Sequence, residues 1–199
     1  SQPPEVPTGE DAPLIVPDPL NPRYSYAGGK IISELMALNY GRKHFERVLV
    51  FRPHNVYGPN MGWEHVLPQF VIRAKAACAA TPSGVVAFPL QGTGSETRAF
   101  VHIDDMIDGL EIMIDRGEHL GIYHIGADDE ITIAEVAHLV AAFFGRQFEL
   151  QPGDLQPGGT LRRCPDISKL AGLGYQPKIS LAEGLPELAR WYVDNPPPA

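Results

Sequence analysis

Residues 21–35 read NPRYSYAGGKIISEL, and the prediction of the fold starts from this stretch. Asn21 is a favourable N-cap residue and Pro22 suits the first position of a helix, so we expect a helix to begin here. The helical pattern extends to about residue 40. Gly41 is predicted to end the helix, because glycine is common just beyond helix C-termini.

The predicted helix carries Tyr26 and Lys30 four residues apart, so both side chains share one face. A free phenol has a pKa of about 10, and a neighbouring ammonium group favours its ionised form. A tyrosine beside a lysine can therefore act as a general acid and base near neutral pH. The same spacing also occurs by chance on many helices, so the pair indicates catalysis only in the company of other motifs.

Residues 47–51 read RVLVF, a short apolar run with β-branched residues that is typical of a buried parallel strand. A helix, a short loop and an apolar strand in succession indicate an α/β fold with the helix packed on a sheet. Ligands of open α/β sheets bind beyond the carboxyl ends of the strands, so residues 52–60 are placed to contact one. Asn55 is the candidate contact in this loop, and a tight turn is the alternative interpretation.

Helices and strands continue to alternate downstream. We expect helices over 64–80, 133–144 and 181–193, a further helix beginning at Asp104, and strands over 85–88, 100–103, 121–125 and 148–150. Thr132 and Glu135 have the spacing of a capping box. Residues 91–98, QGTGSETR, predict a glycine turn that ends in Arg98. Its guanidinium group can clamp a diphosphate or form a surface ion pair.

The order of these motifs resembles that of the extended short-chain dehydrogenase/reductases, in particular their nucleotide-sugar epimerase, dehydratase and decarboxylase branch. The resemblance covers about residues 19–192, and its specificity lies in the ordered set rather than in any one motif. The set comprises Tyr26-x-x-x-Lys30, Glu34, Arg52-Pro53-x-Asn55-Val56-Tyr57-Gly58-Pro59 and Gly92-x-Gly94-x-x-x-Arg98-x-Phe100-x-x-x-Asp104-Asp105.

The resemblance implies a fold that combines the C-terminal part of a Rossmann-type parallel-sheet domain with a small α/β substrate-binding domain. Residues 1–60 would end the Rossmann-type domain and carry the catalytic helix. Residues 61–199 would form mainly the nucleotide-sugar-binding domain, with about 98–126 returning to the Rossmann sheet.

The resemblance also implies a function and a cofactor. The expected protein is an NAD-dependent nucleotide-sugar epimerase or dehydratase that transiently oxidises a sugar hydroxyl. Tyr26 and Lys30 match the catalytic pair, and together with Pro53 they would contact NAD. One departure from the family pattern is Gly29, where the family usually has serine.

Substrate contacts follow from the same resemblance. Asn55, Arg98 and Arg163 match positions that hold a nucleotide sugar, a UDP-sugar by preference, and Arg162 is a neighbouring candidate. Without the family match, Arg162 and Arg163 read as a solvated basic pair. Two alternative functions are open: a nucleotide-sugar decarboxylase of the same family, and a non-catalytic module that only binds the nucleotide sugar.

The 199 residues contain no strand, glycine-rich turn and helix of the kind that holds the NAD pyrophosphate. The serine or threonine that precedes the family's catalytic tyrosine is also absent. We therefore expect the N-terminal half to be supplied by a missing segment or by another chain, because a lone fragment would leave an unpaired sheet edge. The complete enzyme is expected to be a homodimer.

Composition excludes several classes of function. A net charge of −8 with interspersed acids and bases argues against nucleic-acid and anionic-membrane partners. No apolar run approaches the roughly 18 residues of a membrane span. Seven histidines show no metal-ligand spacing, so no metal site is expected. Cys78 and Cys164 make no disulfide framework, which favours a reduced, cytoplasmic protein.

Overall fold

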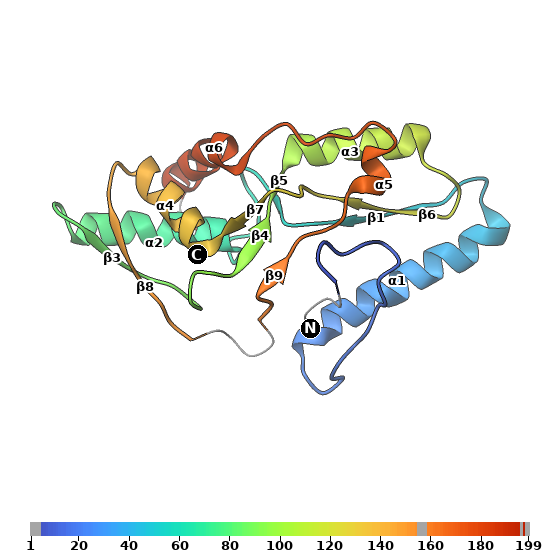
Figure 1. Cartoon of the computed structure of the whole chain (residues 1–199), viewed down its shortest axis with the longest axis horizontal. Helices are drawn as coiled ribbons and strands as arrows, with labels where there is room; N and C mark the ends of the chain where they lie inside the picture. Colours follow the sequence, from blue (N-terminus) through green and yellow to red (C-terminus); the bar gives the residue numbers. More distant parts are fainter. Residues whose placement is uncertain (1–4, 155–158, 196, 198–199) are drawn as a thin grey trace.

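The computed structural model describes residues 5–154, 159–195 and 197, which form alternating helices and short strands (Figure 1). The helices are α1 (Arg23–His44), α2 (Val66–Ala80), α3 (Ile103–Arg116), α4 (Ile133–Phe143), α5 (Ser168–Ala171) and α6 (Leu181–Asp194). The strands are β1 (Leu49–Pro53), β2 (Val56–Tyr57), β3 (Val86–Pro89), β4 (Thr97–Ala99), β5 (Val101–His102), β6 (Gly121–Ile125), β7 (Glu130–Thr132), β8 (Phe148–Gln151) and β9 (Arg162–Arg163). Strand pairs β1–β6, β2–β5, β3–β8 and β4–β9 are parallel, which confirms the α/β class.

Helix α1 differs from its predicted bounds at both ends. Its N-cap is Pro22 rather than Asn21, because the Tyr24 amide donates to the Asn21 carbonyl in a turn that precedes the helix. Gly41 does not end the helix, which continues to His44. Gly41 is buried, and a Cβ at this position would overlap the Val48 side chain. The glycine therefore allows the last turn of α1 to pack closely against the chain that enters β1.

The β1–β6 pair forms a layer between two helices, with α3 on one face and α1 on the other (Figure 1). Its parallel register joins Leu49 to Gly121 and Pro53 to Ile125, so both strands end at the same edge. Behind the α3 face lies a buried cluster of Val101, Met106, Met113, Tyr123, Ile125, Ala127, Ile167, Leu170 and Tyr175. The short helix α5 belongs to this cluster through Leu170.

A second lobe is formed by α2, α4 and α6 with the β3–β8 pair. Its larger cluster includes Leu67, Phe70, Val71, Val86, Phe88, Val136, Val140, Phe148, Leu185 and Leu188. The predicted capping box of Thr132 and Glu135 is confirmed at the start of α4, and Ser180 with Glu183 forms another at α6. The predicted division into two domains stays a prediction.

The strand predicted over residues 100–103 is interrupted. Strand β4 pairs with β7 and β9, whereas β5 pairs with β2. The chain changes partners at Phe100, which lies between the two strands, and α3 begins at Ile103. In the first turn of α3, Asp105 is buried, and its carboxylate accepts hydrogen bonds from the Lys178 and Ile179 amides. This acid holds the chain that leads into α6.

Candidate active site

A cavity of about 520 Å³ opens between α1, the carboxyl ends of β1 and β6, and residues 8–15. We call it the α1 cavity; its lining includes Tyr26, Lys30, Glu34, Arg52, His124 and Arg163. Residues 8–15 are fixed here because the Thr8 amide donates to the Cys164 carbonyl and the Asp166 amide donates to the Thr8 carbonyl. The helix predicted to be catalytic therefore lies at the strand ends, where an α/β sheet binds its ligands.

Tyr26 and Lys30 form one wall of the α1 cavity. The Lys30 ammonium lies 5.4 Å from the centroid of the Tyr26 ring, within the range of a cation–π contact. Tyr26 is 73% exposed, so its hydroxyl is not enclosed in packed hydrocarbon. A Cβ added at Gly29 would meet no atom within 4 Å, so the α1 backbone is open there. The pair is accessible to a ligand.

A second cavity, of about 460 Å³, is lined by residues of α2, β4 and β9, and we call it the arginine cavity. Asn55, Arg98, Phe100, Thr160 and Arg163 are among its lining residues. Asn55 adopts a positive φ of 43°, which asparagine tolerates better than most residues, and its side-chain amide donates to the Ala99 carbonyl at 2.7 Å. Asn55 therefore bends the chain between β1 and β2, and it lines a cavity as the sequence analysis expected of a ligand contact.

The Arg98 guanidinium is oriented by backbone carbonyl groups. It donates to the carbonyls of Thr97 at 2.6 Å and Thr160 at 2.7 Å. Burial lowers the pKa of this guanidinium, and the nearby charge of Arg163 acts in the same direction. Among the residues that the structure describes, Arg98 forms no ion pair with a carboxylate. Arg73, Arg98 and Arg163 line this cavity together with Glu64 and Glu96, and the excess of positive charge favours an anionic ligand.

The glycine turn before Arg98 is organised by Glu96, a residue to which the sequence analysis gave no role. Its buried carboxylate accepts hydrogen bonds from the amides of Thr93, at 3.0 Å, and Gly94, at 2.9 Å. Burial alone would raise the pKa of this carboxyl, but these hydrogen bonds outweigh burial and hold the pKa below its usual range. Glu96 therefore fixes the turn that precedes Arg98, and Arg98 lines the cavity.

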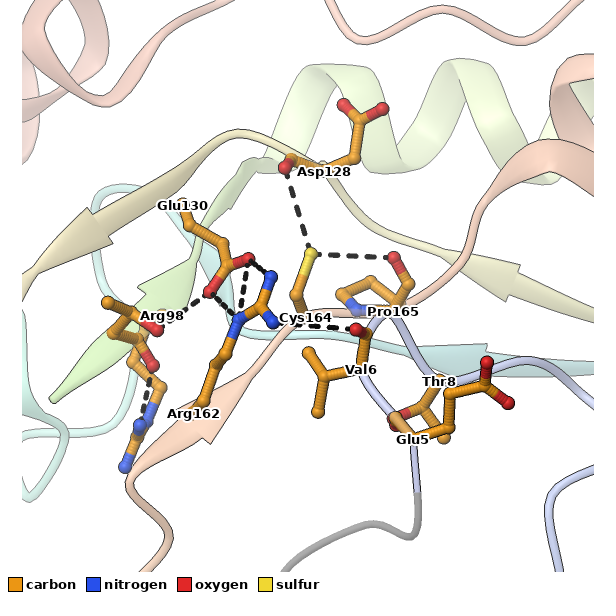
Figure 2. A network of polar contacts seen from close by, with 10 residues as sticks. Glu5, Val6, Thr8, Arg98, Asp128, Glu130, Arg162, Cys164 and Pro165 are labelled. Carbon is orange, nitrogen blue, oxygen red and sulfur yellow. Dashed lines mark hydrogen bonds and ion pairs between the residues drawn. The ribbon is translucent and has the colours of Figure 1, made fainter.

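Arg163 lines both cavities, whereas Arg162 lines neither. Figure 2 shows the Arg162 guanidinium directed at Glu130, with Nη2 at 2.5 Å from one carboxylate oxygen and Nε at 2.9 and 3.0 Å from the two oxygens. This carboxylate raises the pKa of the Arg162 guanidinium. Pro53 is exposed at the end of β1 and lines neither cavity. Substrate contact by Arg162 and cofactor contact by Pro53 stay predictions.

Comparison with known protein families identifies the family to which this chain belongs. Residues 3–126, more than half of the chain, match the family described as "NAD dependent epimerase/dehydratase family". The chain belongs to this family. The resemblance on which the sequence analysis relied is thereby confirmed, together with the α/β fold that it implied.

Individual members of the epimerase/dehydratase family show the extent of the match. A probable GDP-L-fucose synthase 1 of Oryza sativa subsp. japonica is 36% identical over 182 residues, which are 89% of this chain and 55% of that protein. UDP-glucuronic acid decarboxylase 3 of Arabidopsis thaliana is 34% identical over 186 residues, 87% of this chain and 52% of that protein. A crystal structure of dTDP-glucose 4,6-dehydratase from Streptomyces venezuelae with NAD bound has a TM-score of 0.74 at 30% identity, covering 94% of this chain and 54% of that one.

The chain spans about half the length of these relatives. The relatives carry out three differently named activities on nucleotide sugars. The family match therefore establishes a class of protein, while the particular reaction of this chain belongs to a proposal.

The sequence analysis missed a pair of histidines that lines the α1 cavity of this family member. His54 and His124 lie edge to face with ring centroids 4.5 Å apart. Burial, followed by the charge of His124, lowers the pKa of His54 to about 3. Among the described residues, His54 Nε2 and His124 Nδ1 are buried without a hydrogen-bond partner. His54 directly follows β1 and His124 lies near the carboxyl end of β6, so the two rings meet only because these strands are neighbours. The pairing of β1 with β6 was not predicted.

The described part of the chain offers neither a metal cluster nor a membrane span. No group of three or more histidine, cysteine, aspartate and glutamate side chains there is arranged to hold a metal ion. None of the helices described is both long enough and apolar enough to cross a membrane. The two cysteines are free, with Cys164 buried and Cys78 partly buried.

Proposed function

We propose that the complete protein is an NAD-dependent nucleotide-sugar epimerase or dehydratase that acts through transient oxidation of a sugar hydroxyl. The observation that carries this proposal is that Arg163 lines both the arginine cavity and the α1 cavity. A nucleotide sugar is an elongated ligand with its diphosphate between the nucleoside and the sugar. A diphosphate at Arg163 would leave the nucleoside in the arginine cavity and the sugar in the α1 cavity, beside Tyr26 and Lys30.

The electrostatics of the arginine cavity support a diphosphate ligand. Arg98 and Arg163 repel each other, and a bound diphosphate would neutralise both charges while accepting bidentate hydrogen bonds. Asn55 would contact the same group from the end of β1. A UDP-sugar stays the predicted substrate. The relatives' names carry GDP, UDP and dTDP, which supports the nucleotide-sugar class without selecting one base.

Proton transfer in the α1 cavity is assigned to Tyr26. In its phenolate form, Tyr26 would accept the proton of a sugar hydroxyl while hydrogen leaves the carbon that bears this hydroxyl as hydride. The phenol formed in this way would return the proton when the carbonyl is reduced. When bound, NAD supplies the hydride acceptor for this oxidation. Lys30 fits a cofactor, because its ammonium forms no ion pair among the described residues and can donate to a ribose hydroxyl. Tyr26, Lys30 and Pro53 are thus the proposed cofactor contacts.

The complete protein is also proposed to contain an upstream part that covers β1 and α1. In the described residues β1 pairs with β6 on one side, and its other edge has no strand beside it. The α1 residues Leu35, Met36 and Tyr40 are more than half exposed although they are apolar. This chain matches only 55% and 52% of two relatives, which supports a further segment at this surface, in the same chain or in another.

The test uses the complete protein and two matched tyrosine variants. Tyr26→Phe removes only the proposed acid/base hydroxyl and should lower kcat by about 10²–10⁴-fold. Nucleotide-sugar affinity, measured by titration calorimetry, should change by less than about threefold because the Arg98 and Arg163 contacts are retained. Tyr24→Phe is the control, since Tyr24 lies two residues away and does not line the α1 cavity.

Wild-type turnover by Tyr26→Phe would remove the acid/base assignment. Tight nucleotide-sugar binding by the wild-type protein, with no product and no change in NAD absorbance at 340 nm, would favour the non-catalytic binding module instead. Release of carbon dioxide from a UDP-uronic acid would favour the decarboxylase.

A further inference from the structure

Arg52 connects three separate segments of the chain beneath the α1 cavity. From strand β1, its Nε donates to Glu34 Oε2 at 2.9 Å and its Nη2 donates to Glu34 Oε1 at 2.7 Å. Its Nη1 donates to the main-chain carbonyl of Glu10 at 2.9 Å. The side chains of Arg52 and Glu34 are only 18% and 13% exposed, so this ion pair is shielded from water.

The acidic partner lies on the helix of the proposed catalytic pair. Glu34 follows Lys30 by four residues, so it occupies the same face of α1 one turn further along. Leu35 and Met36, which follow Glu34 on α1, are more than half exposed. The rotation of α1 about its axis is therefore fixed mainly from the Glu34 side.

The second partner lies in the segment that covers the cavity. Glu10 belongs to residues 8–15, and its carboxylate accepts a hydrogen bond from the His124 amide at 2.8 Å. Arg52 Nη1 is also 3.5 Å from His124 Nε2. An arginine always donates, so His124 Nε2 acts as the acceptor in this contact. The covering segment, β6 and α1 thus meet at one guanidinium group.

We propose that Arg52 is a positioning residue for the Tyr26–Lys30 pair. Its two hydrogen bonds to Glu34 set the rotation of α1 about its axis. Its hydrogen bond to the Glu10 carbonyl holds residues 8–15 against the α1 cavity. Paired hydrogen bonds between a guanidinium and a carboxylate fix orientation as well as distance, which a single ammonium cannot do. The inference rests on the proposed function, in which the position of Tyr26 relative to Arg163 decides the rate.

The test compares two arginine-to-lysine variants of the complete protein. Arg52→Lys keeps the positive charge and loses the paired geometry. Its kcat should fall by about 10–100-fold, because a displacement of about 1 Å can cost a factor of 10². The Kd of the nucleotide sugar should stay within about threefold of wild type, since Asn55, Arg98 and Arg163 are unchanged.

Hydrogen–deuterium exchange supplies a readout that does not depend on turnover. Amides in residues 26–40 and 8–15 should exchange at least about tenfold faster in Arg52→Lys, because loss of the paired contacts lets both segments open more often. Arg146→Lys is the matched control: Arg146 donates to the carbonyls of Thr81 and Gly84, away from both cavities. It should leave kcat and the exchange of these two segments unchanged.

A second variant keeps the proposal testable if Arg52→Lys is poorly folded. Glu34→Gln retains the shape of the partner and removes its charge, and its kcat should fall in the same direction by a smaller factor. The double variant should be no slower than the slower single variant, because both changes break one contact.

Unchanged exchange in residues 26–40 would overturn the proposal, and so would equal losses in kcat and in nucleotide-sugar affinity. A full turnover rate in Tyr26→Phe would instead refute the proposed function. In that case the exchange measurement still decides whether Arg52 fixes α1.

Discussion

The α2–α4–α6 lobe and the α1 side of the molecule differ in how much apolar surface they bury. In the lobe, α6 buries Leu185 and Leu188 almost completely. Its first turn is closed by the capping box of Ser180 and Glu183. Along α1, Gly41 is the one residue of described burial that is fully buried. The helix that carries the proposed chemistry has only a half-buried inner face, which combines Ala27, Ile31 and Leu38 with the shielded ion pair of Glu34.

This difference predicts which region depends less on further protein. A lobe with a closed apolar core can keep its shape without further protein, because burial of apolar surface dominates stability. A helix with exposed Leu35, Met36 and Tyr40 gains little from burial and opens at lower cost. The side proposed to bind the nucleotide is thus expected to be rigid, while the side proposed to carry acid/base chemistry depends on Arg52 and on the proposed upstream segment.

The largest expected effect comes from breaking the closed core. Phe88 is 1% exposed and lies 4.7 Å from the Phe148 ring and 5.3 Å from the Phe70 ring. Phe88→Ala should lower the free energy of unfolding by about 3–5 kcal/mol, because it removes apolar contacts and leaves a cavity. Urea unfolding followed by tryptophan fluorescence reports this directly, since Trp63 and Trp191 pack against the same core.

The matched control is Phe45→Ala at the end of α1, where the ring is 63% exposed. Its effect should stay within about 0.5 kcal/mol, as for most surface substitutions. Equal losses for the two phenylalanines would show that the α1 side is packed as tightly as the lobe, and the contrast between the regions would disappear.

Features encoded by neighbouring residues were predictable from the sequence. The strand at Gly121–Ile125 and the Thr132–Glu135 capping box were predicted at the positions where they occur. Each depends on residues within a few positions of one another, so a local pattern is sufficient. Tyr26 and Lys30 share a wall of one cavity for the same reason, because helical spacing alone brings them together.

Features that depend on distant residues were not predictable. Gly41 reads as a helix stop, and only the approach of Val48 explains why a glycine stands inside the helix. The break at Phe100 follows from a change of strand partners, which a single sequence does not reveal. Arg162 and Arg163 are adjacent in sequence and alike in type, but Glu130 engages Arg162 and leaves Arg163 to line both cavities. The family resemblance implied a role for each arginine, but the neighbouring residues in the sequence did not show which of the two lines a cavity.

An intermediate effect is expected from pH on the α1 side. His54 has a folded-state pKa of about 3, against 6.5 for a free imidazole. Below pH 6.5 the unfolded chain binds a proton that the folded chain excludes, so stability falls as the pH drops from 6.5 towards 3. At pH 5 this amounts to about 2 kcal/mol, from 1.36 kcal/mol for each pH unit. Burial also lowers the pKa of His124, which adds a loss in the same direction.

Replacement of His54 by an apolar ring tests this assignment. In His54→Phe, the difference in unfolding free energy between pH 7 and pH 5 should be about 2 kcal/mol smaller than in wild type. His44→Gln, at the exposed end of α1, should keep the wild-type difference. A wild-type pH dependence in His54→Phe would mean that the imidazole pair is not the acid-sensitive element of the α1 side.

The smallest expected effect tests whether a further segment packs on the exposed face of α1. Met36 is 54% exposed, so Met36→Ala should change the stability of the 199-residue chain by no more than about 0.5 kcal/mol. In the complete protein the same substitution should cost about 1–2 kcal/mol, because an upstream segment packed on α1 would bury the rest of this side chain. Ile114→Ala on α3, at 56% exposure, is the control and should have the same small effect in both proteins. If Met36→Ala is equally mild in the complete protein, this face of α1 stays open to solvent there, and Arg52 must fix the catalytic helix with no apolar packing on its far side.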